Sequence, residues 1–519
     1  MSTRLLPLAP IGAVAAEDAG GRMKRSGATP TLARRRRAAV ALGVLTALTI
    51  TACADDAGPD ASAAEPTTVT DPVTEPADAA TDSDASGEPA EPAPASTEAA
   101  LPRYATDDDS VLFDQERLHT FEIDLPESAL AEIDADPAAE EYVEGSLTFD
   151  GETIEPVGIR YKGSVGAFVG CTSGANPLQA QGPKTCTKLS MKLKINWDDP
   201  DVEFYGVRRV QLHAQNLDPS LMHERLGYWL FREMGIPAPR STHARVVVNG
   251  EYLGVFALTE EIDGRFARAN FDDGTGNVYK EVWPIDADGA ARPAKDFIDG
   301  LETNEDDDPT AEIITTFAAE LAAAAPGERV RVLERWVDLD TLIATFVVDR
   351  AIRHDDGPLH WYCFEECEPH NFYWYEDPSR ERLTLIPWDL DNAFDALVPG
   401  TAVGNFIAIG DPFGAITNDC QPFPYGNFNL PQRSAACDPM IAAVASLDDD
   451  FERIRAELLT GPFADERITE QLLAWTAQIE PAVAEAAALH DDAPTVDEWR
   501  AARDQLVIAL QASREGDGR

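Results

Sequence analysis

Residues 354–394 constrain the fold most, because they set acids, an amide and a dense group of aromatic side chains around two short apolar runs. The runs HNFYWYED and ERLTLIPWDLD have the β-branched and aromatic composition of strands, and the DPS between them is a turn signal. We therefore expect a β-hairpin. Asp389 and Asp391 follow its second strand and share one side of the chain if the strand geometry persists.

The polar residues of this segment match the needs of phosphoryl transfer. Asp356 stands in HDDGP, a turn signal after an apolar helix, and Asn371 opens the first strand. In that chemistry one carboxylate orients the attacking hydroxyl, while an amide oxygen and a second carboxylate hold the magnesium that neutralises nucleotide phosphates. The alternative is that these acids are solvated surface groups, as most Asp residues are. Their aromatic surroundings favour the functional interpretation.

The charge balance excludes one class of partner. The 519 residues include 92 acids and 42 bases, for a net charge of -50. Nucleic acid is bound through basic patches, so we expect no nucleic-acid partner. A large negative charge suits a secreted, highly soluble protein. The length allows two or three domains, or one large domain with appendages.

The N-terminus predicts export to a membrane surface. The basic run 34–37, the apolar run 38–50 and the sequence ITAC ending at Cys53 resemble a bacterial lipoprotein signal. The apolar run is too short to span a bilayer comfortably. We therefore expect a lipid anchor on Cys53 at the extracellular face of the cell membrane. The alternative is an ordinary secretory signal, and Met23 is a candidate for the true start.

A long acidic segment follows the signal. Residues 54–101 hold twelve acids and no base, and are rich in Ala, Pro, Thr and Ser. Such a segment buries too little apolar surface to offset the entropy of ordering. We expect a disordered, extended tether between the membrane and the folded part.

The cysteines support an oxidising compartment. Apart from Cys53, the seven cysteines fall as three neighbouring pairs, and pairing of neighbours is the simplest of fifteen connectivities. A zinc site is the alternative, although the spacing lacks paired CxxC motifs or a Cys/His set. The expected disulfides are Cys171 with Cys186, Cys363 with Cys367, and Cys420 with Cys437.

The folded part begins with strands, and the run SLTFDGETIEPVGIRYKG predicts a hairpin around Asp150-Gly151. A strand over 157–162 ends in the sequence GSVG, where backbone amides could approach a phosphate, although a plain turn explains it equally well. The segment KLSMKLKI places Lys188, Lys192 and Lys194 on one strand face. Lysines commonly protect a sheet edge, but a kinase also needs one strand lysine for the nucleotide phosphates.

A helix and a hairpin follow. Asp218 is a suitable N-cap and Pro219 a suitable first residue for a helix whose acids, Glu224 and Glu233, are candidate partners for the strand lysine or surface groups. Next, STHARVVVNGEYLGVFALTEEI predicts a hairpin with an Asn-Gly turn. It runs into 260–264, which suits a hinge between a sheet part and a helical part, or an ordinary strand exit.

The rest of the chain is mainly helical by its apolar periodicity. Strands first and helices later predict an α+β, two-lobed body. The expected helices cover 310–325, 338–353, 439–459, 464–489 and 495–512.

Several of these motifs together resemble a known family. The run LHAQNLDPSLMHERLGYWLFREMGIPAPRSTHARVVVNGEYLGVFALTEEID, followed by HDDG, HNFYWY and IPWDLDNAF, resembles the spore-coat protein H (CotH) family of secreted, kinase-like proteins. The resemblance covers roughly 111–397, and the helical C-terminus follows less distinctly. It implies a two-lobed atypical protein-kinase fold that uses ATP with Mg²⁺ or Mn²⁺ and phosphorylates Ser or Thr of exported proteins.

The resemblance also assigns roles to residues. Asp356 corresponds to the catalytic-loop Asp and Asn371 to the metal-binding Asn. The acids of WDLD correspond to the metal-binding Asp, with Asp389 favoured over Asp391 because it leaves the strand first. Two further groups would bind the nucleotide. Lys188 or Lys192 would contact its phosphates, and the segment from Glu260 to Ile262 would line its adenine.

The implied organisation has four parts. They are the N-terminal extension and signal (1–53), the tether (54–108), an N-terminal kinase-like lobe (109–264) and a mainly helical lobe (265–519).

The sequence departs from the family pattern in three places. In the helix, residues 223–225 do not fix a partner for the strand lysine. Asp395 stands where the family usually has Gly after the metal-binding acid, and an insertion with two cysteines separates Asp356 from Asn371. A non-catalytic cell-surface binding or scaffold protein on the same fold is therefore the second hypothesis. A third, metal-dependent phosphoester hydrolysis, would use similar acids without a hinge.

Overall fold

The computed structural model describes residues 103–163, 165–174, 180–307, 309–354, 356–363, 366–394, 419–425 and 430–516. The signal, Cys53, most of the tether and Asp395 lie outside these residues. The described part is a mixed α+β body, as expected from the sequence.

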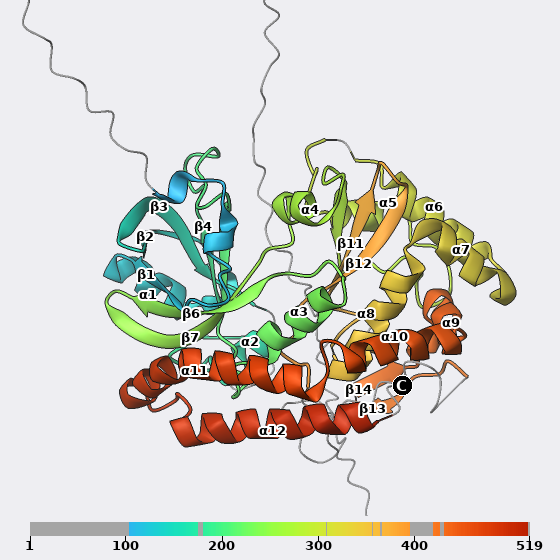
Figure 1. Ribbon diagram of the computed structural model, residues 1–519. Coiled ribbons are helices and arrows are strands. Elements are labelled where there is room, and N and C mark those ends of the chain that lie inside the picture. The colour runs from blue at the N-terminus through green and yellow to red at the C-terminus, as the bar shows by residue number, and fades with distance from the viewer. Residues whose placement is uncertain are drawn as a thin grey trace, which may run out of the picture. The chain divides into compact units, whose positions relative to one another are not determined.

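Seven strands close into a barrel in the order β1-β2-β3-β4-β5-β7-β6 (Figure 1). Neighbouring strands are antiparallel except β1 and β6, which are parallel. The sequence predicted most of these strands, but neither β5 nor the closure. The barrel strands are β1 (His119–Asp124), β2 (Val143–Phe149), β3 (Glu152–Tyr161), β4 (Met191–Lys194), β5 (Arg209–His213), β6 (Ser241–Val248) and β7 (Glu251–Thr259).

Two tight turns build this barrel as the sequence predicted. Asp150 and Gly151 join β2 to β3, and Asn249 and Gly250 join β6 to β7. All four residues have positive φ, between 49° and 80°. Two-residue hairpin turns of this type need positive φ at both central positions, which Asn, Asp and Gly tolerate best.

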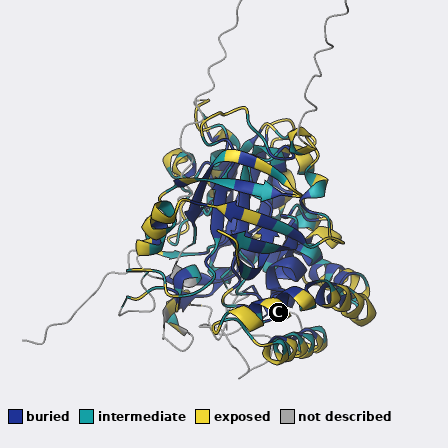
Figure 2. Cartoon of the chain, turned by 90° about the vertical axis from the view of Figure 1, so that its left-hand side faces the viewer, coloured by how far each residue is buried: buried dark blue, intermediate teal, exposed yellow. Residues whose placement is uncertain are grey.

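The barrel interior is one of two hydrophobic cores. It is filled by alternating residues of the strands, and Figure 2 shows the strands largely buried, with exposed residues mainly on the surrounding loops and helices. The central residues of this core include Phe121, Leu147, Phe149, Val157, Ile159, Leu193, Leu212, Val246 and Leu258.

Two smaller sheets accompany the helices. The aromatic hairpin is confirmed: β11 pairs with β12 from Phe372 opposite Pro387 to Asp377 opposite Arg382. The three-stranded sheet has the order β12-β11-β8, and the four-stranded sheet β10-β9-β14-β13. These strands are β8 (Asn277–Lys280), β9 (Trp361–Cys363), β10 (Cys367–Glu368), β11 (Phe372–Asp377), β12 (Arg382–Pro387), β13 (Phe423–Tyr425) and β14 (Leu430–Arg433).

The predicted helices are present with one division. The run predicted over 439–459 is two helices, because three acids, which favour a helix start, follow Leu447. No helix among the described residues is long and apolar enough to cross a membrane. The helices are α1 (Glu127–Ala135), α2 (Val165–Phe168), α3 (His223–Glu233), α4 (Gly264–Asn270), α5 (Ala294–Asp299), α6 (Glu312–Ala323), α7 (Arg329–Trp336), α8 (Leu339–Ile352), α9 (Pro439–Ala445), α10 (Asp448–Thr460), α11 (Asp465–Leu489) and α12 (Val496–Glu515).

Helix α3 starts later than predicted. Asp218 does not precede the helix directly, because the chain first makes a turn in which Leu221 has a φ of 60°. The Asp218 carboxylate nevertheless accepts hydrogen bonds from the backbone N–H groups of Ser220, at 2.8 Å, and His223, at 2.7 Å. It therefore caps the helix from a distance.

The second core unites the helical part with α3. It includes Leu226, Phe346, Trp374 and Trp475, from α3, α8, β11 and α11. Helices α11 and α12 lie side by side in Figure 1. The hydroxyl of Tyr252 in β7 donates to the carbonyl of Ala482 at 3.0 Å, so α11 also contacts the barrel.

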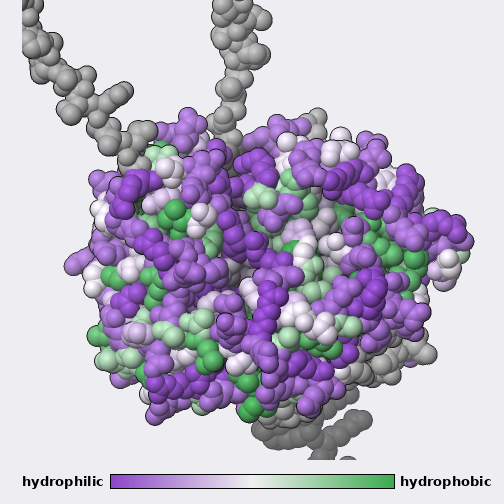
Figure 3. Space-filling view, in the orientation of Figure 1, coloured by the Kyte–Doolittle hydropathy of each residue, from purple (hydrophilic) through white to green (hydrophobic). Residues whose placement is uncertain are grey.

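The surface agrees with the acidic composition. On the face seen in Figure 3, hydrophilic residues predominate and apolar residues are scattered among them.

All three expected disulfides are present, each between neighbouring cysteines. The last residues of the predicted tether are described and bind the folded part: Asp107 pairs with Arg265, and the ring of Tyr104 lies 6.3 Å from that of Phe204.

Candidate functional site

Asp356 and Asn371 meet where the turn after α8 reaches the start of β11. The Asn371 side-chain Nδ2 donates to Asp356 Oδ2 at 2.9 Å, and its backbone N–H donates to Glu281 Oε1 at 3.0 Å. Asn371 is buried and has a φ of 56°, in the left-handed region that Asn tolerates better than most residues. The predicted catalytic acid and the predicted metal-binding amide are thus in direct contact.

Asp389 reaches the same place from the end of β12. The backbone N–H of Trp388 donates to the carbonyl of Asn371 at 3.1 Å. Asp389 itself has a φ of 50°, so the strand geometry ends before it. The condition under which Asp389 and Asp391 were expected to share a strand face is therefore not met. The turn still keeps both acids at this end of the hairpin.

Helix α3 and His354 hold the backbone around Asp389. The N–H of Asp389 donates to the hydroxyl oxygen of Tyr228 at 3.0 Å, and its carbonyl accepts from His354 Nε2 at 2.9 Å. The α3 backbone also passes close to the next residue: a Cβ on Gly227 would lie 2.7 Å from Leu390 Cδ1. A side chain at this position would therefore force Leu390 to shift, and glycine lets α3 approach the segment that carries the acids.

The carboxyl groups of the site raise one another's pKa values. Burial, with the charges of Asp389 and Glu281 adding to it, raises the pKa of Asp356 to about 6. Burial is also the largest cause that raises the pKa of Asp389, followed by the charge of Glu224. The pKa of Asp391 lies well above its usual range through burial and the charges of Asp389, Glu224 and Asp356.

These oxygen donors suit a hard divalent cation. Crowded carboxyl groups with raised pKa values ionise readily only when a positive charge joins them. Among the described residues, no three His, Cys, Asp or Glu side chains form a group arranged to hold a metal ion. Magnesium commonly takes only one or two carboxylates, and completes its shell with water and phosphate oxygens. Asn371, Asp389 and Asp391 fit that pattern of donors.

Lys162 is a site residue that the sequence analysis did not select. It follows β3 directly, and its Nζ lies 3.1 Å from His213 Nε2 and 5.5 Å from the ring centre of Trp388. The positive charge of Lys162 partly offsets the rise in the pKa of Asp389, so Lys162 interacts with the acidic group. The signal that could have found it is its position, immediately before the glycine-containing segment GSVG.

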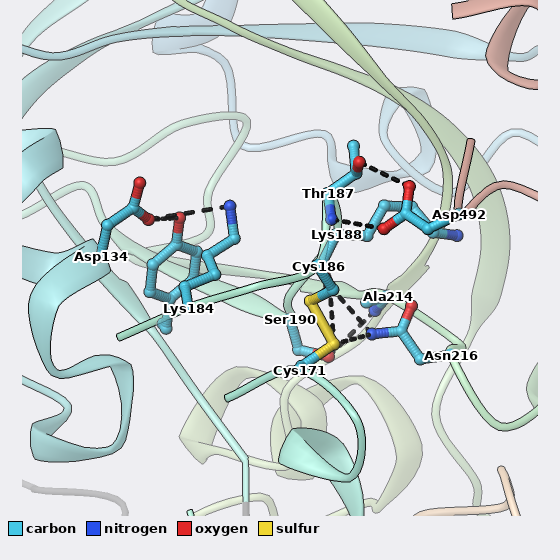
Figure 4. The surroundings of a disulfide bond; sticks show 11 residues. Asp134, Cys171, Lys184, Cys186, Thr187, Lys188, Ser190, Ala214, Asn216 and Asp492 are labelled. Atoms are coloured by element: carbon cyan, nitrogen blue, oxygen red, sulfur yellow. Dashed lines mark hydrogen bonds and ion pairs between the residues drawn. A yellow bond between two sulfur atoms is a disulfide. The ribbon is translucent and has the colours of Figure 1, made fainter. Parts of the chain in front are cut away.

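The two lysines that the sequence analysis did select, Lys188 and Lys192, have other surroundings. Strand β4 starts at Met191, so Lys188 is outside it and does not share its face. Lys188 Nζ donates to the carbonyl of Val255 at 3.0 Å beside the Cys171–Cys186 disulfide (Figure 4), and burial lowers its pKa to about 8. Lys192 Nζ lies 3.1 Å from Glu261 Oε1.

The predicted adenine-binding segment follows β7 as expected. The Glu260 carboxylate accepts from the backbone N–H and Nε of Arg240, at 2.9 and 3.0 Å, and Ile262 is buried in the second core. A pocket borders this segment. Its lining is Leu112, Phe113, Val207, Arg209, Val210, Gln211, Leu258, Thr259, Glu260, Glu261, Asp263, Arg265 and Phe266.

Fold and site together define a class of protein. It is a mixed α+β protein with a closed barrel and a helical part, in which Asp356, Asn371 and Asp389 lie on the turns around an aromatic hairpin. The chain belongs to the CotH family, because the family model described as CotH kinase protein matches residues 159–510. The match confirms the resemblance seen in the sequence, and it extends through the C-terminal helices.

Two curated relatives from Bacillus subtilis (strain 168) are similar to this chain. Inner spore coat protein H is 36% identical over 201 residues, which are 36% of this chain and 50% of that protein. The Inner spore coat protein H-like protein is 35% identical over 63 residues, which are 12% of this chain and 20% of that protein. The chain thus spans half, or less, of the length of these relatives.

Proposed function

We propose that this chain is an exported CotH-like kinase that transfers the γ-phosphate of ATP to Ser or Thr of exported proteins. The observation that carries the proposal is the hydrogen bond between Asn371 and Asp356, with Asp389 close enough to alter the pKa of Asp356. The barrel would serve as the smaller lobe and the helical part as the larger lobe of an atypical protein-kinase fold.

Asp356 is the residue that would accept the proton of the attacking hydroxyl. A pKa of about 6 makes its carboxylate more basic than an ordinary Asp while leaving it ionised near neutral pH. A general base works best when its pKa lies near the working pH. Asn371 would hold the orientation of this carboxylate through its side-chain N–H.

Asn371, Asp389 and Asp391 would hold Mg²⁺ or Mn²⁺ through their side-chain oxygens. A bound divalent ion neutralises charge on the nucleotide phosphates. Lys162, whose charge already acts on Asp389, would contact the same phosphates. The segment from Glu260 to Ile262 would line the adenine, and Cys53 would carry the lipid that keeps the enzyme at the cell surface.

The test uses the whole chain made under oxidising conditions, with γ-labelled ATP, Mg²⁺ or Mn²⁺ and dephosphorylated casein. We expect labelled protein from the wild type and none from Asp389→Ala. Asp377→Asn is the matched control, because Asp377 is a buried acid at the far end of β11, where its carboxylate accepts from the N–H of Ser379. It should label as the wild type does.

Two results would overturn the proposal. Absence of label from a folded wild type, with no rise in melting temperature on adding ATP and metal together, would leave a binding or scaffold protein. Release of inorganic phosphate at a rate that depends on Asp389, without labelled protein, would identify a hydrolase instead.

A further inference from the structure

His213, the last residue of β5, is hydrogen-bonded to a carboxylate on one side of its ring. Its Nδ1 lies 2.7 Å from Oε1 and 2.9 Å from Oε2 of Glu224. An ionised carboxylate can only accept hydrogen bonds. Burial raises the pKa of Glu224, but His213, the Thr259 hydroxyl and the charge of Lys162 together hold this pKa below its ordinary value. Nδ1 of His213 therefore carries the proton.

The other side of the ring faces Lys162. In a neutral imidazole with its proton on Nδ1, Nε2 has a lone pair and accepts. The Lys162 ammonium lies 3.1 Å from this Nε2 and can only donate. The three side chains thus form a hydrogen-bonded relay, in which Lys162 donates to His213 and His213 donates to Glu224.

Buried groups hold both ends of this relay in place. The Thr259 hydroxyl donates to Glu224 Oε2 at 2.6 Å, and only 2% of Glu224 is exposed. At the other end, Lys162 also donates to the buried side chain of Gln211, and its ammonium lies over the ring of Trp388. Hydrogen bonds in such a setting polarise one another and are poorly screened by water.

We propose that His213 and Glu224 are positioning residues that hold the Lys162 ammonium in place for nucleotide phosphates, with the histidine ring inserted between acid and lysine. The inference rests on the proposed function, since it assumes a phosphate ligand. Lysine is a point charge on a flexible stem, and its rotamer entropy is lost on binding unless other groups have already ordered it. Ordering by the relay would remove that cost.

The first test does not involve nucleotide. Histidine labelled with ¹⁵N reports the tautomer by NMR, and comparison with His213→Gln identifies the signals of His213. We expect an Nδ1-protonated ring with an unprotonated Nε2 in the wild type, and a changed signal in Glu224→Gln. A ring protonated on Nε2 in the wild type would overturn the relay.

The second test measures Mg²⁺-ADP binding by calorimetry for the full-length wild type and variants. We expect Lys162→Met and His213→Ala each to weaken binding about tenfold, because each breaks a hydrogen bond to a charged group. The double variant should bind no more weakly than Lys162→Met alone, since His213 acts only through Lys162. Additive losses would overturn the positioning role.

A matched control separates positioning from general destabilisation. His243 is a buried histidine of β6 whose Nε2 donates to the carbonyl of Leu221 at 2.6 Å, outside the relay. His243→Gln should keep the wild-type affinity, and an equal loss in this variant would refute a specific role for His213. If the wild type itself does not bind Mg²⁺-ADP, the proposed function fails, while the tautomer still decides whether the relay exists.

Discussion

Asn371 Nδ2 donates to Asp356 Oδ2 at 2.9 Å across fifteen residues of sequence. The intervening segment is the cysteine-containing insertion that makes this loop longer than the family pattern suggests. Its disulfide links Cys363 to Cys367, which face each other where β9 pairs with β10. The insertion therefore folds back on itself, and the acid and the amide still meet.

The first prediction concerns pH. Asp356 must be ionised to accept a proton, and its pKa is raised to about 6. The initial rate of protein labelling should therefore rise as pH increases through about 6 and level off above it. Asp356→Asn should lower the rate by a factor of about 10² to 10⁴, the usual contribution of a general base. Rates measured between pH 5 and 8 check both points.

A flat profile across this range in the wild type would contradict the role of Asp356 as base. Asp377→Asn, at the opposite end of β11, should keep the wild-type profile. It shares the carboxyl chemistry but not the site.

Local signals in the sequence predicted much of the fold. The Asp150-Gly151 and Asn249-Gly250 turns and the aromatic hairpin are set by residues near one another in the chain, and each is confirmed. The disulfides also join neighbouring cysteines. By contrast, closure of the barrel depends on the parallel pairing of β1 with β6, which lie far apart in sequence. No local pattern reports such a pairing.

The site was predictable in part for the same reason. Asp356, Asn371 and Asp389 stand in motifs that can be recognised one at a time. Lys162 could not be ranked above Lys188 and Lys192, because its role depends on contacts with β5 and Trp388. The sequence also did not predict the turn after the hairpin, where Asp389 has a positive φ, because the residues around it have the composition of a strand.

The second prediction concerns the hold of Tyr228 on Asp389. Tyr228→Phe removes the α3 hydroxyl that accepts from the Asp389 N–H, so the left-handed turn at Asp389 loses one of its hydrogen bonds. A buried donor without a partner costs about 1–3 kcal/mol, so the free energy of unfolding should fall by that amount. The labelling rate should fall about tenfold, because the Asp389 carboxylate, which we propose to hold the metal, moves with its backbone.

Tyr252→Phe is the matched control for this prediction. The hydroxyl of Tyr252 donates to the carbonyl of Ala482 at 3.0 Å, away from the acidic group. Its loss should lower stability by a similar amount, as measured by urea denaturation, without changing the labelling rate of the folded protein. Equal losses of activity in both variants would mean that Tyr228 acts only through stability.

The third prediction concerns Asp349, a buried acid of α8 whose pKa is raised to about 7 by burial. Its carboxylate oxygens have no hydrogen-bond partner among the described residues. The native state thus keeps this proton after the unfolded chain has lost it, and stability falls as pH rises from about 4 to about 7. Each pH unit of that interval costs about 1.4 kcal/mol.

Asp349→Asn removes this titration. The variant should therefore gain stability relative to the wild type as pH rises from 4 to 7, as measured by urea denaturation at each pH. Asp340→Asn is the control, because Asp340 lies on the same helix with 70% of its side chain exposed. A difference between wild type and Asp349→Asn that does not change with pH would refute the prediction.

The last prediction concerns the disulfide between Cys171 and Cys186. Cys171 and Cys186 are separated by 15 residues, and Thr187 donates from its backbone N–H to Asp492 at 2.7 Å, which ties this loop to the segment between α11 and α12 (Figure 4). Closing a loop of this length stabilises a fold by about 3 kcal/mol through the unfolded state. Replacing both cysteines by Ala should lower the free energy of unfolding by about that amount.

The Cys363–Cys367 bridge closes a loop of only 4 residues, so its removal should cost less, about 2 kcal/mol by the same relation. Urea denaturation of the two double variants measures the difference, and a larger loss for the shorter loop would contradict the argument.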